Sequence, residues 1–280
     1  MPERAEITPV EPDPVRTGEG SELTPRCLTI ATSDSGGGAG IQADLKAFAA
    51  AGCHGMTVLV ALTAQNTVAV TDVHTLPPAF VRAQLDAVFD DIGVDAAKTG
   101  MLFSRELIAA VADYFAEHPV PLVVDPVMVA SSGAKLLQDD AVETLVGRLF
   151  PLATVVTPNL PEARVLSRAQ RDAEPEELAK AIHALGPRAV VVTGGHRAEA
   201  AIDVFFDGER MEAIEGERYE GGSAHGSGCT HSSVLAVHLA RGDDPLAAAR
   251  AAKRIAGEAV RNGLGEIGQG PGPVDVVGLR

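Results

Sequence analysis

The sequence has few aromatic residues and no tryptophan. Phe, Tyr and Trp together make up 4% of its 280 residues, whereas hydrophobic residues as a whole make up 46%. Ala, Val and Leu dominate that apolar content. Because small aliphatic side chains suit helices packed on a β-sheet, this composition favours an α/β fold over an aromatic-rich sandwich or barrel.

Cysteine is also scarce, and long apolar runs are absent. Cys27, Cys53 and Cys229 lie far apart, a pattern that indicates neither a disulfide framework nor a zinc site. A reducing cytoplasm is therefore the expected location. No stretch approaches the roughly 18 apolar residues that would predict a membrane-spanning helix.

The N-terminal segment lacks the apolar core of a signal peptide and is rich in proline and acidic residues. Such a composition buries too little apolar surface to offset the entropy lost on ordering. We expect residues 1–24 to form a disordered tail and residues 25–280 to form a single domain.

Positive charge is in short supply. The chain has 23 Lys and Arg against 38 Asp and Glu, which gives a formal net charge of −15. Nucleic acid and anionic membranes are repelled by such a surface, so neither is an expected partner.

From residue 25 onward, strand and helix patterns alternate along the chain. This alternation predicts an α/β fold with a central, mostly parallel sheet and helices on both faces. Asp207-Gly208 is typical of a hairpin and predicts an antiparallel edge. The expected strands are 26–31, 55–61, 68–75, 94–99, 121–125, 153–157, 188–193, 201–206 and 210–214; the expected helices are 41–51, one after residue 78, 105–117, 139–149, 175–185, 226–241 and 244–262.

Several polar residues stand where the expected strands end. In parallel sheets, ligands bind at the carboxyl ends of the strands, so these residues are candidates for a binding site. Lys98 is the exception, since a lone lysine at a strand end is usually solvated. The residues are Asp34, Gln65, Asn66, Lys98, Asp125, Asn159, Thr193 and Gly194.

A first glycine-rich segment, residues 33–44, follows a strand. It is not a dinucleotide-binding motif, because Ile41 occupies the place of the last glycine, and the chain has no GxxxxGK[ST] phosphate loop. The segment is either an ordinary glycine turn or a loop that brings backbone close to a small flat ligand. Gln42 offers one amide donor and one acceptor beside it.

A second glycine-rich segment, residues 225–230, precedes an apolar helix. Gly226, Ser227 and Gly228 would leave free N–H groups at the helix start, which favours an anion. Cys229 falls in the first turn, where the helix dipole lowers a thiol pKa, so a thiolate there can accept a proton from a substrate hydroxyl. Equally, Cys229 is a small core residue after a glycine turn; local features do not decide.

Asn159 and Glu162 have the spacing of a capping box, with Pro161 inside the first turn. The same glutamate can also help to hold Mg²⁺ near phosphates, and Asp125 is a second candidate for the metal. Both readings remain open.

Eight segments occur in a recognisable order: SDSGGGAGIQADLK (33–46), TAQNT (63–67), KTGML (98–102), VDPVM (124–128), SSGAKLL (131–137), TPNLPEA (157–163), GGH (194–196) and HGSGCT (225–230). Together they closely resemble the hydroxymethylpyrimidine/phosphomethylpyrimidine kinases of the ribokinase superfamily, over residues 26–275. The resemblance implies a ribokinase-like fold, a homodimer, ATP and Mg²⁺. It also implies two successive phosphorylations of 4-amino-5-hydroxymethyl-2-methylpyrimidine on the thiamine pathway.

The resemblance also implies roles for individual residues. Those implied to contact the pyrimidine are Asp34, Gly36, Gly38, Gln42, Met101 and Val127; those implied to organise Mg²⁺ and phosphate are Asn159 and Glu162; and those implied to form the anion hole and supply the base are Gly226, Ser227, Gly228 and Cys229. To these the residues themselves add Asp125 as a metal candidate and Thr193 and Arg197 as candidates near the ATP phosphates.

The chain departs from the family pattern at Thr193, where the family has a lysine before Gly-Gly-His. We expect Arg197 to supply the missing charge. Two other functions are compatible with the sequence: a pyridoxal-type kinase on the same scaffold, and a non-catalytic pyrimidine-binding regulatory protein. Retention of Cys229, Asn159 and Glu162 argues against the second, because a binding protein needs none of them.

Overall fold

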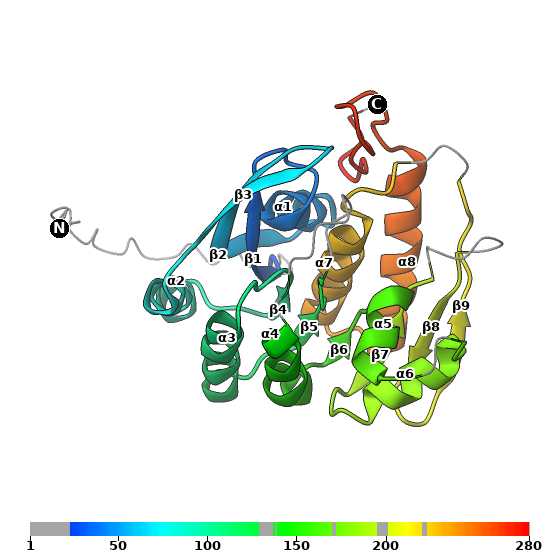
Figure 1. Ribbon diagram of the computed structural model, residues 1–280, viewed down its shortest axis with the longest axis horizontal. Coiled ribbons are helices and arrows are strands. Elements are labelled where there is room, and N and C mark those ends of the chain that lie inside the picture. The colour runs from blue at the N-terminus through cyan, green and yellow to red at the C-terminus, as the bar shows by residue number, and fades with distance from the viewer. Residues whose placement is uncertain are drawn as a thin grey trace, which may run out of the picture.

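A nine-stranded sheet forms the centre of the protein. The structure, a computed structural model, describes residues 23–128, 137, 139–169, 172–194, 201–219 and 223–279. The strand order within these residues is β3-β2-β1-β4-β5-β6-β7-β8-β9 (Figure 1). The strands are β1 (Arg26–Asp34), β2 (His54–Gln65), β3 (Val70–Thr75), β4 (Ala96–Thr99), β5 (Leu122–Val124), β6 (Val155–Val156), β7 (Ala189–Val192), β8 (Asp203–Phe206) and β9 (Met211–Ile214).

Most of the sheet is parallel, as the sequence predicts. Strands β2, β1, β4, β5, β6 and β7 run parallel to one another, and β8 and β9 form the predicted antiparallel hairpin at one edge. At the other edge β3 pairs antiparallel with β2. The sequence indicates β3 as a strand but not its direction, which depends on the short connector after Gln65.

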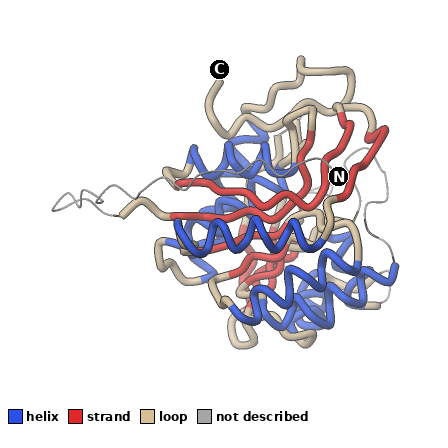
Figure 2. The backbone as a smooth tube through the Cα atoms, turned by 90° about the vertical axis from the view of Figure 1, so that its left-hand side faces the viewer, coloured by secondary structure: helices blue, strands red, loops and turns tan. Residues whose placement is uncertain are grey.

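Helices cover both faces of the sheet (Figures 1 and 2). One core contains residues of α1, α7 and α8, and the other contains residues of α2 to α6. This two-faced arrangement confirms the predicted fold class. The helices are α1 (Gly40–Ala50), α2 (Pro78–Asp91), α3 (Arg105–Glu117), α4 (Asp139–Thr144), α5 (Leu160–Ser167), α6 (Pro175–His183), α7 (Ser227–Ala240) and α8 (Pro245–Arg261).

Local sequence signals account for several helix boundaries. Ser104 accepts a hydrogen bond from the N–H of Leu107 at the start of α3, and Asn159 and Glu162 form a complete capping box at the start of α5. The helix expected over 139–149 is continuous but changes character: after Thr144 it continues as a π-helix over Leu145–Leu149.

The parallel strands bring their carboxyl ends to one edge of the sheet. β1 ends at Asp34, β4 at Thr99, β5 at Val124, β6 at Val156 and β7 at Val192. The polar residues that follow these strands are therefore gathered in space although they are far apart in the chain.

Within the described ranges, no helix combines the length and the apolar character needed to cross a bilayer. Residues 1–22 of the expected tail lie outside the described residues, and the single-domain assignment of residues 25–280 stays a prediction.

Candidate active site

A cavity of about 1210 Å³ runs along the carboxyl ends of the strands, between the start of α7, one side of α8 and the loop that follows β9. Most of the residues expected from the sequence lie in its wall. They are Asp34, Met101, Val127, Asn159, Thr193, Asp125, Glu162, Gly226, Ser227, Gly228 and Cys229.

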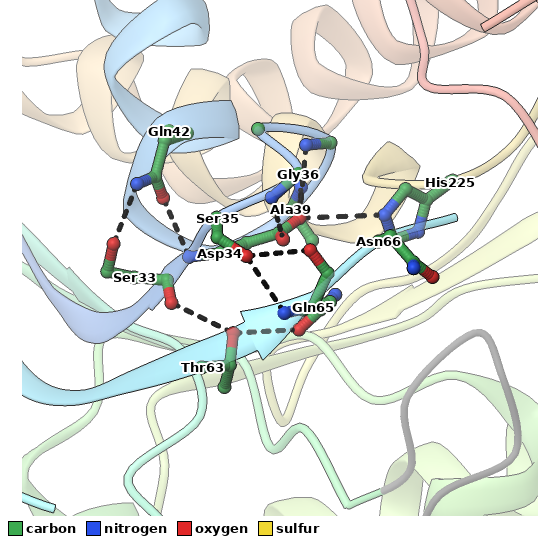
Figure 3. A network of polar contacts seen from close by, with 12 residues as sticks. Ser33, Asp34, Ser35, Gly36, Ala39, Gln42, Thr63, Gln65, Asn66 and His225 are labelled. Atoms are coloured by element: carbon green, nitrogen blue, oxygen red, sulfur yellow. Dashed lines mark hydrogen bonds and ion pairs between the residues drawn. The ribbon is translucent and has the colours of Figure 1, made fainter. Parts of the chain in front are cut away.

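Asp34 organises the first glycine-rich loop (Figure 3). One carboxylate oxygen accepts from the N–H of Gly36 at 2.8 Å, and the other accepts from Gly38 at 3.0 Å and Ala39 at 2.9 Å. Burial alone would raise the pKa of Asp34, but His225 and these N–H groups outweigh it and hold the pKa below its usual value. Asp34 therefore borders the cavity as the ionised centre of the loop.

The expected contacts Gly36, Gly38 and Gln42 are not brought to the described wall of the cavity. Gln42 points back into the loop: its oxygen accepts from the N–H of Asp34 at 2.9 Å and its nitrogen donates to Ser33 at 2.7 Å (Figure 3). The N–H groups of Gly36 and Gly38 donate to the carboxylate of Asp34 and so stabilise the turn. The side chain of Gln42 thus links α1 to β1, and one N–H and one lone pair of its amide remain for a ligand.

Gln65 lies in the wall of the cavity. Its oxygen lies 3.2 Å from the hydroxyl of Thr63, while its nitrogen has no hydrogen-bond partner among the residues that the structure describes. The sequence places Gln65 at a strand end, and this was the available signal.

The start of α7 is built on a glycine in the left-handed region. Gly226 has φ +84°, and a Cβ at this position would lie 2.0 Å from the carbonyl oxygen of Gly38. Only glycine therefore allows the two glycine-rich loops to pack against each other. The N–H groups of Gly228 and Cys229 follow in the first turn, where a helix has no internal acceptors for them.

The expectation of a lowered pKa for Cys229 is wrong. Burial raises the pKa of the thiol to about 12, and Lys98 opposes this shift without overcoming it, while Asp44 and Asp125 add to it. The helix dipole is a weak effect beside the loss of water around the sulfur. The raised pKa favours the neutral thiol over the thiolate.

The expectation of a solvated Lys98 is also wrong. Its side chain is fully buried, and its ammonium lies 2.9 Å from Oδ1 of Asp44, which also accepts from Ser233 at 2.9 Å. The other oxygen of Asp44 accepts from Thr29 at 2.6 Å. Burial is the largest single effect and would lower the pKa of Lys98, but Asp44, Cys229 and Asp125 together outweigh it and raise the pKa above its usual value.

Two carboxylates, those of Asp125 and Glu162, lie at the end of the cavity between α5 and the start of α7. Glu162 accepts from the N–H of Asn159 at 3.0 Å and from that of Met128 at 3.3 Å. Burial, aided by the charge of Asp125, raises the pKa of Glu162 to about 8. Burial likewise raises the pKa of Asp125, which accepts a hydrogen bond from Ser232 at 3.0 Å.

This pair fits Mg²⁺. In the described ranges no group of three or more His, Cys, Asp or Glu residues is placed to hold a metal, but Mg²⁺ commonly uses only one or two carboxylates, with phosphates and water completing its shell. Two buried, mutually repelling carboxylates are the arrangement that a divalent cation would relieve. The capping box and the metal role of Glu162 are therefore compatible.

Thr193 lies beside Asn159 at the same end. Its N–H donates to the carbonyl oxygen of Pro158 at 2.8 Å, and it pairs with Asn159 in a parallel bridge. Arg197, expected to supply the charge that Thr193 lacks, lies outside the described residues.

The chain matches the family model of phosphomethylpyrimidine kinase over residues 34–275. The chain belongs to this family. Its members are kinases, and the resemblance seen in the sequence is thereby confirmed.

Three similar proteins illustrate the relationship. The hydroxymethylpyrimidine/phosphomethylpyrimidine kinase of Rhizobium meliloti is 48% identical, covering 90% of this chain and 97% of that protein. A thiamine biosynthesis bifunctional protein of Geobacter sulfurreducens is 50% identical over 89% of this chain, which spans 51% of that longer protein. The ADP complex of Bacillus subtilis pyridoxal kinase has a TM-score of 0.85 and 40% identity, covering 92% of this chain and 99% of that one.

Proposed function

We propose that the chain transfers phosphate from Mg-ATP to the hydroxymethyl group of 4-amino-5-hydroxymethyl-2-methylpyrimidine and then to the resulting monophosphate. The diphosphate product would enter thiamine diphosphate biosynthesis. One observation carries the proposal: a single cavity joins an anion-binding helix start and a carboxylate pair with an unpaired amide, that of Gln65. Family membership and the printed names of the relatives support the choice of substrate.

The helix start would act on the transferring phosphate. Phosphoryl transfer depends on positioning and on neutralising charge rather than on covalent chemistry by the protein. The N–H groups of Gly228 and Cys229 have no acceptor among the described residues and would donate to the oxygens of the transferring group. Being fixed in the helix, they need no rearrangement as charge develops.

Asp125 and Glu162 would hold Mg²⁺. When bound, Mg²⁺ supplies positive charge that neutralises the oxygens of the ATP phosphates. Asn159 would keep Glu162 oriented through the capping box, and Ser232 would keep Asp125 oriented through its hydrogen bond.

Cys229 would accept the proton of the substrate hydroxyl. Its raised pKa means that only a small thiolate fraction is present near neutral pH, and that fraction grows about tenfold per pH unit. Lys98 limits the cost of ionisation because its buried charge opposes the effect of burial. The proposal therefore requires kcat to increase with pH between about 7 and 10.

Gln65, Met101 and Val127 would hold the pyrimidine. The free amide nitrogen of Gln65 can donate to a ring nitrogen, an acceptor that every pyrimidine carries. Met101 and Val127 add apolar surface against a flat ring. Asp34 would contribute by fixing the loop that borders the ring rather than by direct pairing.

The test is ADP release with three acceptors measured side by side: the pyrimidine alcohol, its monophosphate and pyridoxal. Turnover with both pyrimidines and little with pyridoxal is the expected result. Preference for pyridoxal would favour the second candidate function, a pyridoxal-type kinase, which the similarity to the Bacillus subtilis enzyme supports. No ADP release with any acceptor, with ATP and Mg²⁺ present, would refute the kinase assignment in favour of a regulatory binding protein.

We also propose that the protein works as a homodimer in the cytoplasm, without nucleic acid or membrane partners. Leu62, 41% exposed, and Val68, 56% exposed, lie beside the β2–β3 edge and would offer apolar surface to a second copy of the chain. Light scattering should give twice the chain mass, and a monomer at micromolar concentration would refute the dimer.

A further inference from the structure

Two of the three cysteines meet at the end of the sheet that faces away from the cavity. Cys27 is the second residue of β1, and Cys53 immediately precedes β2, the parallel neighbour of β1. Because the cavity runs along the carboxyl ends of these strands, both cysteines lie at the opposite edge, and both belong to the core beneath α1 and α7. The mechanism proposed above uses neither thiol.

The turn after α1 directs the sulfur of Cys53 towards the start of β1. The N–H of Cys53 donates to the carbonyl oxygen of Phe48 at 2.9 Å, which closes the turn. The sulfur lies 3.1 Å from the carbonyl oxygen of Pro25, and the N–H of His54 donates to that same oxygen at 2.8 Å. The sulfur is therefore held against the residues that precede Cys27.

The two thiols form a hydrogen bond with each other. This bond lowers the pKa of Cys53 and raises that of Cys27, so the proton stays on Cys27 when the pair ionises. The N–H of Cys27 and the guanidinium of Arg241 also lower the pKa of Cys53, against burial and the charge of Asp95. Arg241 is held beside the pair because it donates to the carbonyl oxygen of Ala51. Cys53 is therefore the better nucleophile of the two.

The two thiols also differ in their access to solvent. Cys27 is fully buried, whereas Cys53 is 8% exposed and lies between two exposed residues, Gly52 and His54. A thiol just below the surface and beside a guanidinium is in a setting where cysteines react, whereas a fully buried thiol is inert by itself. A reagent therefore meets Cys53 first and reaches Cys27 only through it.

We propose that Cys53 and Cys27 form a dithiol modification site, which a low-molecular-weight disulfide oxidises to an intramolecular disulfide. The thiolate of Cys53 attacks one sulfur of the small disulfide, so that a mixed disulfide forms, the small S–S bond breaks and one small thiolate leaves. The sulfur of Cys27 then attacks that of Cys53, and the second small thiolate leaves. The two protons and two electrons that the cysteines lose are recovered in two molecules of the small thiol.

The cross-link encloses the part of the chain that carries the first glycine-rich segment. Residues 28–52 contain most of β1, that segment and α1. A disulfide stabilises a protein mainly by restricting the unfolded chain, so oxidation should raise the melting temperature. Because the pair lies away from the cavity, the inference is independent of the proposed kinase function.

The experiment treats the full chain with oxidised glutathione, alkylates the remaining thiols with iodoacetamide and maps the peptides by mass spectrometry. In the folded wild type, the expected product is a pair of peptides joined through Cys27 and Cys53, with Cys229 alkylated. The melting temperature should rise on oxidation and return to its starting value with dithiothreitol.

Two sets of variants test the order of the steps. Cys27→Ala should stop at a stable glutathione adduct on Cys53, and Cys53→Ala should react at Cys27 at least tenfold more slowly than the wild type reacts at Cys53. Arg241→Gln should slow the first step several-fold at pH 7, because the guanidinium favours the thiolate. The matched control, Arg188→Gln, changes an exposed arginine before β7 and should react at the wild-type rate.

Alkylation of all three cysteines in the folded wild type after this treatment overturns the inference, and so does oxidation that occurs only in urea. A lasting glutathione adduct on Cys53 of the wild type, or a bridge through Cys229, overturns it as well. The wild type carries the deciding measurement, so a variant that fails to fold does not change the outcome.

Discussion

Glu162→Gln should change how the stability of the metal-free protein depends on pH. Glu162 is 7% exposed and accepts two backbone hydrogen bonds, from Asn159 and Met128. Even so, burial and the nearby charge of Asp125 raise its pKa from 4.5 to about 8. Ionisation of Glu162 therefore destabilises the folded chain. Glutamine removes the charge and keeps one hydrogen-bond acceptor.

The sign and size follow from proton linkage. The folded carboxyl group binds its proton more tightly than the unfolded one, so its stabilising contribution is complete below about pH 4.5 and is lost as pH rises to about 8. At about 1.4 kcal/mol for each tenfold difference in proton affinity, the loss amounts to roughly 3–5 kcal/mol. Glutamine does not titrate, so its loss of one acceptor is a constant offset at every pH.

Urea unfolding without divalent cations, from pH 5 to pH 9, measures this difference. The free energy of unfolding of Glu162→Gln minus that of the wild type should increase up to about pH 8 and then level off. Glu176→Gln, an exposed acid in the first turn of α6, is the control and should give a flat difference. A flat difference for Glu162→Gln as well would refute the electrostatic reasoning. Added Mg²⁺ should reduce this difference at pH 8, because it stabilises the wild type more than the variant, which has lost one of the two carboxylates.

Three further predictions concern the centre of the site. Cys229→Ala should lower kcat about 10²–10⁴-fold with Kd for the pyrimidine within threefold, and wild-type kcat in this variant would remove the thiol from the mechanism. Lys98→Met should cost about 3–5 kcal/mol in urea unfolding because Asp44 is left buried and unpaired; no recovery on adding Asp44→Asn would contradict this cause. Gln65→Leu should weaken pyrimidine binding by about 1–3 kcal/mol in calorimetry, whereas Gln42→Leu should lower the melting temperature, and the opposite pattern would restore Gln42 to the binding site.

Patterns of short range were enough to predict much of the fold. The alternation of strand and helix predicted the parallel sheet, and Asp207-Gly208 predicted the hairpin that ends it. Ser104 marked the start of α3, because its capping bond is made within one turn. The positions of Asp34, Asn159 and Thr193 at strand ends predicted one shared site, since parallel strands finish at the same edge of the sheet.

Only the tertiary structure decided what these side chains meet. Asp44 is 54 residues from Lys98 in the chain, so neither the burial of that lysine nor its ion pair has a local signal. The raised pKa of Cys229 depends on the protein mass around the sulfur, which a helix-start motif does not reveal. The contacts of Gln42 with Ser33 and Asp34 depend on which way its amide turns, which the glycine-rich motif does not reveal. Lys253 and Asp203 are 50 residues apart in the chain and meet only when the protein folds, so the sequence contains no local signal for their ion pair.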